Sequence, residues 1–245
     1  MKKIITLLFA LVLALSLTAC QNETLDAKSV YEKASANMQK LDSLSSEASM
    51  LLEVSDGTNT LSLALPIDLK ATITKMRTEP EIYTSLGIKY DEVDSLIQMW
   101  QSGGFTYIDV DGTKFYAESA KLKVDDVMLS PDFGSEGLEL TMEEDADGYL
   151  LDMSLDEEKL KSLMGEFGEI ADLKELFEDV VSFSDVSSKM RINKDFYIEN
   201  VSLDFMMEFN EAGSAHVGAD FEYSDFNEAV LPSFAPEEFL ENAAY

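Results

Sequence analysis

The stretch that decides the fold is residues 197–223, which reads YIENVSLDFMMEFNEAGSAHVGADFEY. Apolar side chains recur at every second position on both sides of Asn210–Gly213, with polar side chains between them. A period of two is typical of a strand with one buried face, so the stretch predicts a long antiparallel hairpin with one apolar face. The apolar positions are Tyr197, Val201, Leu203, Phe205, Met207, Phe209, Ala215, Val217, Ala219, Phe221 and Tyr223.

Three further hairpins are predicted upstream, each around an Asp-Gly pair. Asp-Gly favours the tight turns that connect antiparallel strands. In the first hairpin, Pro66 predicts an edge strand or a bulge, because proline cannot donate a hydrogen bond to a ladder. The predicted strand pairs are Ser46–Ser55 with Leu61–Leu69 around Asp56-Gly57, Phe105–Val110 with Thr113–Glu118 around Asp111-Gly112, and Leu138–Glu143 with Tyr149–Ser154 around Asp147-Gly148.

Three segments have helical spacing instead. Ser29 and Glu32 form a capping-box pattern at the start of the first helix. Its apolar stripe is Val30, Ala34, Met38 and Leu41. The second predicted helix is Asp91–Gln101, with Val93, Leu96, Ile97 and Trp100 on one side, and the third runs from Asp156 to about Phe183, with two glycines that divide it.

Together these elements predict an α+β fold. A sheet with one apolar face must bury that face, and the predicted helices are the available cover. We therefore expect a curved antiparallel half-barrel sheet wrapped around helices. The expected boundaries are a single domain over residues 28–235 and a C-terminal tail over 236–245, which two prolines introduce.

The N-terminus has the pattern of an export signal. Lys2 and Lys3 precede an apolar run of 14 residues, Ile4–Leu17, which is too short to span a bilayer permanently. The next residues, Leu17-Thr18-Ala19-Cys20, resemble the lipobox of bacterial lipoprotein precursors. That resemblance implies cleavage between Ala19 and Cys20 and attachment of a diacylglycerol to the Cys20 thiol. Residues 1–19 would then be the signal peptide and residues 20–27 the acylated cysteine with a short tether.

This interpretation places the protein outside the cytoplasm, anchored by acyl chains to the outer face of the cytoplasmic membrane. Cys20 is the sole cysteine, so no disulfide is available and the fold must rely on its own core. The expected partner is the membrane, through the anchor. The sequence leaves the oligomeric state open.

The charge excludes one class of partner. The chain has 18 Lys and Arg against 48 Asp and Glu, a net charge of −30, and loss of Lys2 and Lys3 makes it −32. Such a surface repels nucleic acid and anionic lipid headgroups. Two interpretations of the acidity stay open. The acidic residues form either a solvated surface that prevents aggregation or a surface that binds divalent or cationic ligands.

The order of elements is similar to that of the lipoprotein-carrier-like group, which includes LolA, LolB, LprG and LppX. Four stretches carry the resemblance: Asn37–Ser43, Tyr107–Gly112 with Phe115-Tyr116, Ile198–Phe209, and Tyr223–Asn227 before a proline tail. The resemblance implies an unclosed half-barrel whose concave apolar side holds acyl chains. It supplies no catalytic residues.

The predicted ligand face is rich in methionine and aromatic side chains, and methionine suits adaptable apolar pockets. We expect a hydrophobic ligand, such as a lipid, to bind there. The alternative is a structural or protein-interaction module whose face is an ordinary core packed by helices. The candidate residues are Met50, Leu52, Leu63, Leu65, Val201, Leu203, Phe205, Met207, Phe221 and Tyr223.

No catalytic constellation, metal site or cofactor motif is expected, and the protein is predicted not to be an enzyme. An envelope hydrolase is a further class, since many carboxylate pairs are available. His216, the lone histidine, is expected to be exposed on the polar face. Glu143–Gly148 partly resembles a calcium loop through Asp145 and Asp147, but position twelve is Ser154, and an acidic hairpin turn is the alternative.

Overall fold

The computed structural model describes residues 25–55, 63–90, 93–119, 138–155, 160–161, 180–209 and 213–241. The predicted signal peptide and Cys20 lie outside these residues, as do the Asp56-Gly57 turn and most of the predicted helix from Asp156. Leu160 and Lys161 are helical, in agreement with that prediction.

Helix α2 (Ala27–Met38) follows the predicted apolar stripe, and its buried residues are Val30, Tyr31, Ala34 and Met38. Its N-terminus differs from the prediction. The N-cap is Asp26, whose Oδ1 accepts a hydrogen bond from the Ser29 backbone N–H at 2.7 Å. Ser29 therefore lies inside the first turn and does not cap it, because the carboxylate three residues earlier satisfies this free N–H.

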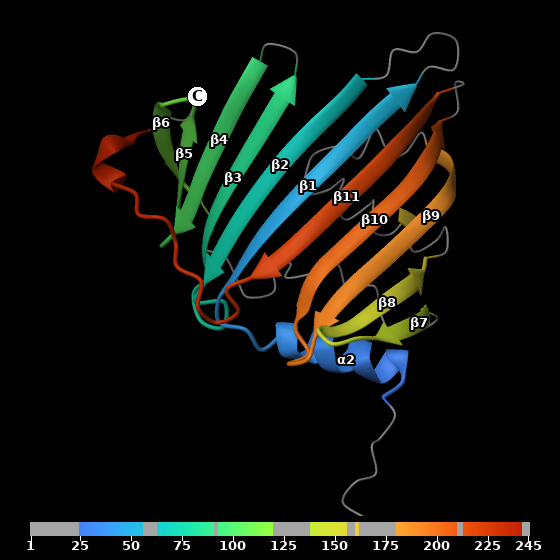
Figure 1. Ribbon diagram of the computed structural model, residues 1–245. Coiled ribbons are helices and arrows are strands. Elements are labelled where there is room, and N and C mark those ends of the chain that lie inside the picture. The colour runs from blue at the N-terminus through green and yellow to red at the C-terminus, as the bar shows by residue number, and fades with distance from the viewer. Residues whose placement is uncertain are drawn as a thin grey trace, which may run out of the picture.

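In the part of the chain that the structure describes, the strands form one curved sheet of twelve, in the order β12-β6-β5-β4-β3-β2-β1-β11-β10-β9-β8-β7 (Figure 1). Neighbouring strands are antiparallel, except that β12 runs parallel to β6. The bounds are β1 (Leu44–Ser55), β2 (Leu63–Thr74), β3 (Glu81–Tyr90), β4 (Val93–Ser102), β5 (Phe105–Val110), β6 (Thr113–Glu118), β7 (Glu139–Glu144), β8 (Gly148–Ser154), β9 (Val180–Asn193), β10 (Ile198–Phe209), β11 (Ser214–Ser224) and β12 (Leu240–Glu241).

The hairpin predicted from residues 197–223 is confirmed as β10 paired with β11. The hairpins around Asp111-Gly112 and Asp147-Gly148 are confirmed too. Asp111 and Gly112 have φ values of 50° and 88°, which is the left-handed conformation that such a two-residue turn needs.

Two secondary-structure predictions are wrong. Asp91–Gln101 was predicted to be a helix, but Val93–Ser102 is strand β4. In this strand, apolar side chains point to both faces, so the period of two is hidden. Val180–Phe183, predicted as the end of the third helix, belongs to strand β9.

The expectation for Pro66 is also wrong, because β2 lies inside the sheet between β1 and β3. Pro66 is opposite Leu51 of β1, and pairing with β3 begins one residue later, at Ile67. Pro66 thus has a strand partner on one side, which explains how an inner strand accommodates it.

The main core lies between α2 and one face of the sheet, which we call the inner face. It is the face that carries Ala48, Val201 and Phe205. Buried residues of α2, β8, β9, β10 and β11 form one apolar cluster there, joined by Leu160. Figure 1 shows α2 lying across the end of the sheet at which β1 and β10 begin.

A second, smaller cluster lies on the opposite, outer face of β3–β6. Residues 228–241 cross this face, and Phe239 packs against Tyr83 and Trp100 in its centre. The Trp100 ring lies 5.4 Å from Phe234 and 6.0 Å from Phe239, between ring centroids. The segment ends in β12 against the β6 edge, so residues 236–241 pack on the sheet where a tail outside the domain was expected.

Candidate functional site

The register of the strands places all ten residues of the predicted ligand face on the inner face. Met50 of β1 lies opposite Ala219 of β11, which lies opposite Leu203 of β10. One row further along, Leu52 pairs with Leu65 on one side and with Val217 on the other. The side chains of Leu52, Leu63 and Leu65 lie outside the described part of the structure, so only their strand positions are known.

Within this set, the residues of β10 differ from the rest. Val201, Leu203, Phe205 and Met207 are buried in the main core, as is Tyr223. Burial raises the pKa of the Tyr223 hydroxyl, which stays protonated. Met50 and Phe221 are only partly buried. The predicted face therefore divides into a filled core on β10 and a partly exposed portion toward β1.

The partly exposed portion continues across β2–β6, where Leu63 and Leu65 were the predicted site residues. The inner face there carries side chains that are apolar and incompletely covered. The alternating pattern of β5 could have identified the inner-face residues of that strand. Those of β4 were missed because Asp91–Gln101 was predicted to be a helix. These residues, which we call the open inner face, are Met50, Ile67, Leu69, Leu86, Ile97, Met99, Ile108, Val110 and Phe115.

The open inner face lacks charge. Among the described strand positions of β1–β6, every Asp, Glu, Lys and Arg falls on the outer face by register. Thr84, Gln101 and Thr106 are uncharged polar residues on the inner face. Because charged residues make up 27% of the chain, their exclusion from this half-buried surface favours contact with an apolar group.

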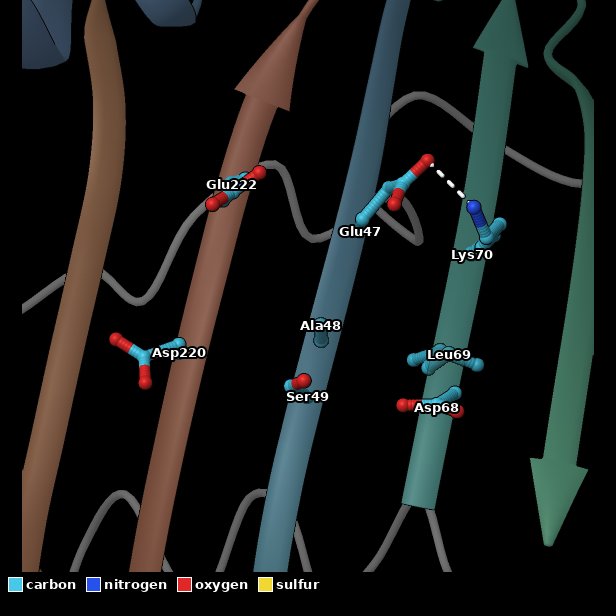
Figure 2. Close-up of a pocket in the computed structure, with 8 residues that line it drawn as sticks. All are labelled: Glu47, Ala48, Ser49, Asp68, Leu69, Lys70, Asp220 and Glu222. Carbon is cyan, nitrogen blue, oxygen red and sulfur yellow. Dashed lines mark hydrogen bonds and ion pairs between the residues drawn. The ribbon is translucent and has the colours of Figure 1, made fainter. Parts of the chain in front are cut away.

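The outer face has the opposite character. A pocket of about 350 Å³ lies over β11, β1 and β2. Its lining includes Glu47, Ser49, Asp68, Lys70, Asp220 and Glu222, which Figure 2 shows on these three strands. Glu47 is directly opposite Glu222, a repulsive arrangement, and its Oε1 accepts a hydrogen bond from Lys70 Nζ at 2.7 Å. That bond raises the pKa of Lys70.

His216 lies on the outer face, as predicted, and is partly exposed. Its Nε2 is 2.9 Å from Asp204 Oδ2 and its Nδ1 is 3.2 Å from Glu53 Oε2. A carboxylate on each side favours the imidazolium form, since a neutral ring can donate from one nitrogen alone. The hydrogen bonds to Asp204 and then Glu53 raise the pKa of His216. The ring thereby links β1, β11 and β10.

The acidic loop that partly resembles a calcium site forms the β7–β8 turn. Asp145 Oδ1 accepts hydrogen bonds from the backbone N–H groups of Asp147 and Gly148, at 2.8 and 3.0 Å. Its other oxygen binds Arg191 at 2.7 Å, and this contact lowers the pKa of Asp145. One oxygen of Asp145 thus stabilises the turn, and the other pairs with Arg191 of β9. Across the described residues, no three His, Cys, Asp or Glu side chains are grouped to hold a metal ion.

Comparisons with known proteins give structural likeness alone. No family model matches the chain, and no curated protein matches it. A crystal structure of LprF from Mycobacterium bovis is similar at 12% identity, with 84% of this chain and 96% of that chain covered and a TM-score of 0.47. A DUF1329 family protein from Desulfovibrio piger is similar at 11% identity over 86% and 96% of the two chains, with a TM-score of 0.27. A beta-barrel-like DUF1849 protein from Brucella abortus is similar at 7% identity over 76% and 99%, with a TM-score of 0.23.

No helix among the residues that the structure describes combines the length and the apolar character that crossing a bilayer requires.

Proposed function

We propose that this protein is an envelope lipoprotein, anchored through acyl chains on Cys20, that binds a lipid or a similar apolar molecule on the open inner face. It acts by binding, without catalysis, at the outer face of the cytoplasmic membrane. The anchor rests on the agreement of Lys2-Lys3, the apolar run and the lipobox in position. Two acyl chains give stable attachment, which one chain does not.

The observation that carries the ligand proposal is the incomplete burial of an uncharged, apolar sheet face. Ile97, Met99 and Ile108 lie at the centre of that face and are partly exposed. Contiguous exposed apolar surface is uncommon on soluble proteins and marks sites of interaction with apolar partners.

The chemistry of the face suits an amphipathic ligand. Met50 and Met99 have flexible thioether side chains that adapt to acyl chains of different shape. Thr84, Gln101 and Thr106 supply hydroxyl and amide groups that can hydrogen-bond an ester or hydroxyl of the ligand. The absence of lysine and arginine from these strand positions favours an uncharged portion of the ligand at this surface.

Native mass spectrometry with organic extraction tests the ligand. The acylated full-length protein is purified from a bacterial membrane, and non-covalent lipid is separated from the covalent anchor by extraction. We expect a lipid at near-stoichiometric amount. Met99→Glu, which places a charge on the open inner face, should abolish co-purification, because burying an unpaired carboxylate against an acyl chain is costly.

The matched control is Leu96→Glu, which adds the same charge on the outer face of the same strand, where Leu96 is 45% exposed. This variant should retain the lipid. A lipid-free mass for the wild type, unchanged after incubation with envelope lipids, would overturn ligand binding and favour the interaction module. The anchor is tested separately by the mass of the mature N-terminus and by its loss in Cys20→Ser.

A further inference from the structure

Cations are not evenly distributed over the molecule. In the part of the chain that the structure describes, most lysine and arginine side chains with described positions contact a carboxylate, for example Lys70 with Glu47 and Lys189 with Asp152. Four exposed cations have no such contact, and these are Lys33, Lys40, Arg77 and Lys194.

These four residues lie on segments that pack against one another at one end of the sheet. Lys33 Nζ lies 3.5 Å from the centre of the Phe196 ring, in the β9–β10 turn that also carries Lys194. The Asn37 side chain of α2 donates to the carbonyl oxygens of Asp195 and Phe196. Helix α2 and this turn therefore form one surface.

The β2–β3 turn extends the same surface. The Met76 backbone N–H donates to the Asp42 carbonyl at 3.0 Å, which joins the turn that carries Arg77 to the loop that carries Lys40. The Asp42 backbone N–H in turn donates to Asn227 Oδ1 at 2.8 Å, which joins this loop to the segment after β11. Figure 1 shows α2, the start of β1 and the β2–β3 turn at the same end of the sheet.

This surface, which we call the tether end, comprises residues 25–43, 75–80, 193–197 and 225–229. It contains six Lys and Arg against seven Asp and Glu, whereas the whole chain has 18 against 48. The adjoining β7–β8 turn adds Asp145, paired with Arg191, and Asp147. The described chain also begins here, at Leu25, five residues after Cys20.

We propose that the tether end docks on anionic phospholipid headgroups and orients the domain with its strands pointing away from the bilayer. The proposal rests on the Cys20 anchor of the proposed function. Leu25 packs against the core and follows Cys20 by five residues, which reach about 17 Å when extended, so the domain stays near the surface. Among the described contacts, Lys40, Arg77 and Lys194 have no carboxylate partner and can pair with phosphate groups, as can Lys33, whose Nζ lies over the Phe196 ring.

The acidic surface of the rest of the domain does not prevent the tether end from docking on anionic headgroups. Charges act across a Debye length of about 8 Å at physiological ionic strength. A strand of twelve residues, such as β1, extends about 40 Å, so carboxylates at its far end are screened from the headgroups. The net charge disfavours other orientations, because they would bring the acidic outer face to the anionic surface.

The test uses the acylated full-length protein in vesicles, with one environment-sensitive label on an added cysteine. Acylation blocks the Cys20 thiol, so Gln39→Cys labels the tether end and Ser184→Cys labels an exposed site toward the other end of β9. Vesicles are made of phosphatidylcholine alone or mixed with phosphatidylglycerol, and both contain a headgroup-linked quencher. We expect quenching at residue 39 that increases with phosphatidylglycerol, and little quenching at residue 184.

The triple variant K40Q/R77Q/K194Q should lose the response of residue 39 to phosphatidylglycerol. The control K70Q/K114Q/K189Q removes three cations that are paired with carboxylates away from the tether end, gives the same net charge, and should keep the response. Equal quenching at both labels, or equal loss in both variants, would overturn the proposal. Failure of the anchor is distinguishable, because a protein without acyl chains would not co-float with vesicles of either composition.

Discussion

Strands β8–β10 and strands β3–β5 belong to one continuous sheet, yet the two regions are covered on opposite faces. Over β8–β10 the inner face is closed by α2, and Leu151, Met190 and Val201 are fully buried. Over β3–β5 the C-terminal segment closes the outer face around Trp100, and the inner face is left partly open. The same alternating pattern can therefore build a closed core in one region and a partly exposed apolar surface in another.

The largest expected difference between the regions is the loss in free energy of unfolding when an inner-face isoleucine is truncated to alanine. Ile192 of β9 is completely buried, so Ile192→Ala should lower the free energy of unfolding by about 4 kcal/mol through lost burial and a cavity. Ile97 of β4 is partly exposed, and Ile97→Ala should cost about 1 kcal/mol. Urea denaturation of both variants measures this difference. Equal costs would mean that the inner face over β4 is as well packed as the core.

The second prediction concerns the C-terminal segment. Phe239 is 6% exposed against Trp100, so Phe239→Ala should cost about 3 kcal/mol. Trp100 is the sole tryptophan, and its fluorescence emission should shift to the red as water reaches the ring. Leu240→Ala is the control, because Leu240 is 75% exposed and should leave both stability and emission unchanged. An unshifted spectrum in Phe239→Ala would show that the segment does not shield Trp100.

The same contrast explains what could be predicted from the sequence. In β10, Asp204 and Glu208 mark the solvent face and Leu203 and Phe205 the core, so the strand was identified correctly. In β4, Trp100 is buried on the outer face while Ile97 and Met99 face inward. A segment from the distant C-terminus makes Trp100 a core residue, and a local pattern cannot show this.

Strand β9 was missed for a different reason. Its pairing with β10 shifts register between Asp204 and Met206, so inward positions change from odd to even numbers between Phe183 and Val186. A bulge of this kind destroys strict alternation. The candidate site was predicted in part, since the ten named positions share the inner face. Whether a residue on that face is buried, as on β10, or partly exposed, as on β3–β5, depends on the segments that cover the sheet. Strand alternation does not specify these segments.

A third prediction compares two glycines, one in each region. Gly148 begins β8 at φ +150°, and an added Cβ would lie 2.2 Å from the Ile192 carbonyl oxygen, so Gly148→Ala should cost about 2 kcal/mol as the backbone shifts. Gly103 lies in the β4–β5 turn at φ +62° with no atom within 4 Å of such a Cβ, and Gly103→Ala should cost about 1 kcal/mol. Thermal unfolding distinguishes the two. A larger loss for Gly103→Ala would contradict the tighter packing assigned to β8.

The smallest expected effect is the pH dependence that His216 adds on the outer face of the covered region. Asp204 and Glu53 raise its pKa in the folded protein above the ordinary value of 6.5. The stabilisation is therefore complete below about pH 6 and is lost as the pH rises through the raised folded value. Because the ring is partly exposed, the effect should be below about 1 kcal/mol. His216→Gln should lower the melting temperature at pH 6 and change it little well above the raised value, whereas the reverse dependence would show that the neutral ring is the stabilising form.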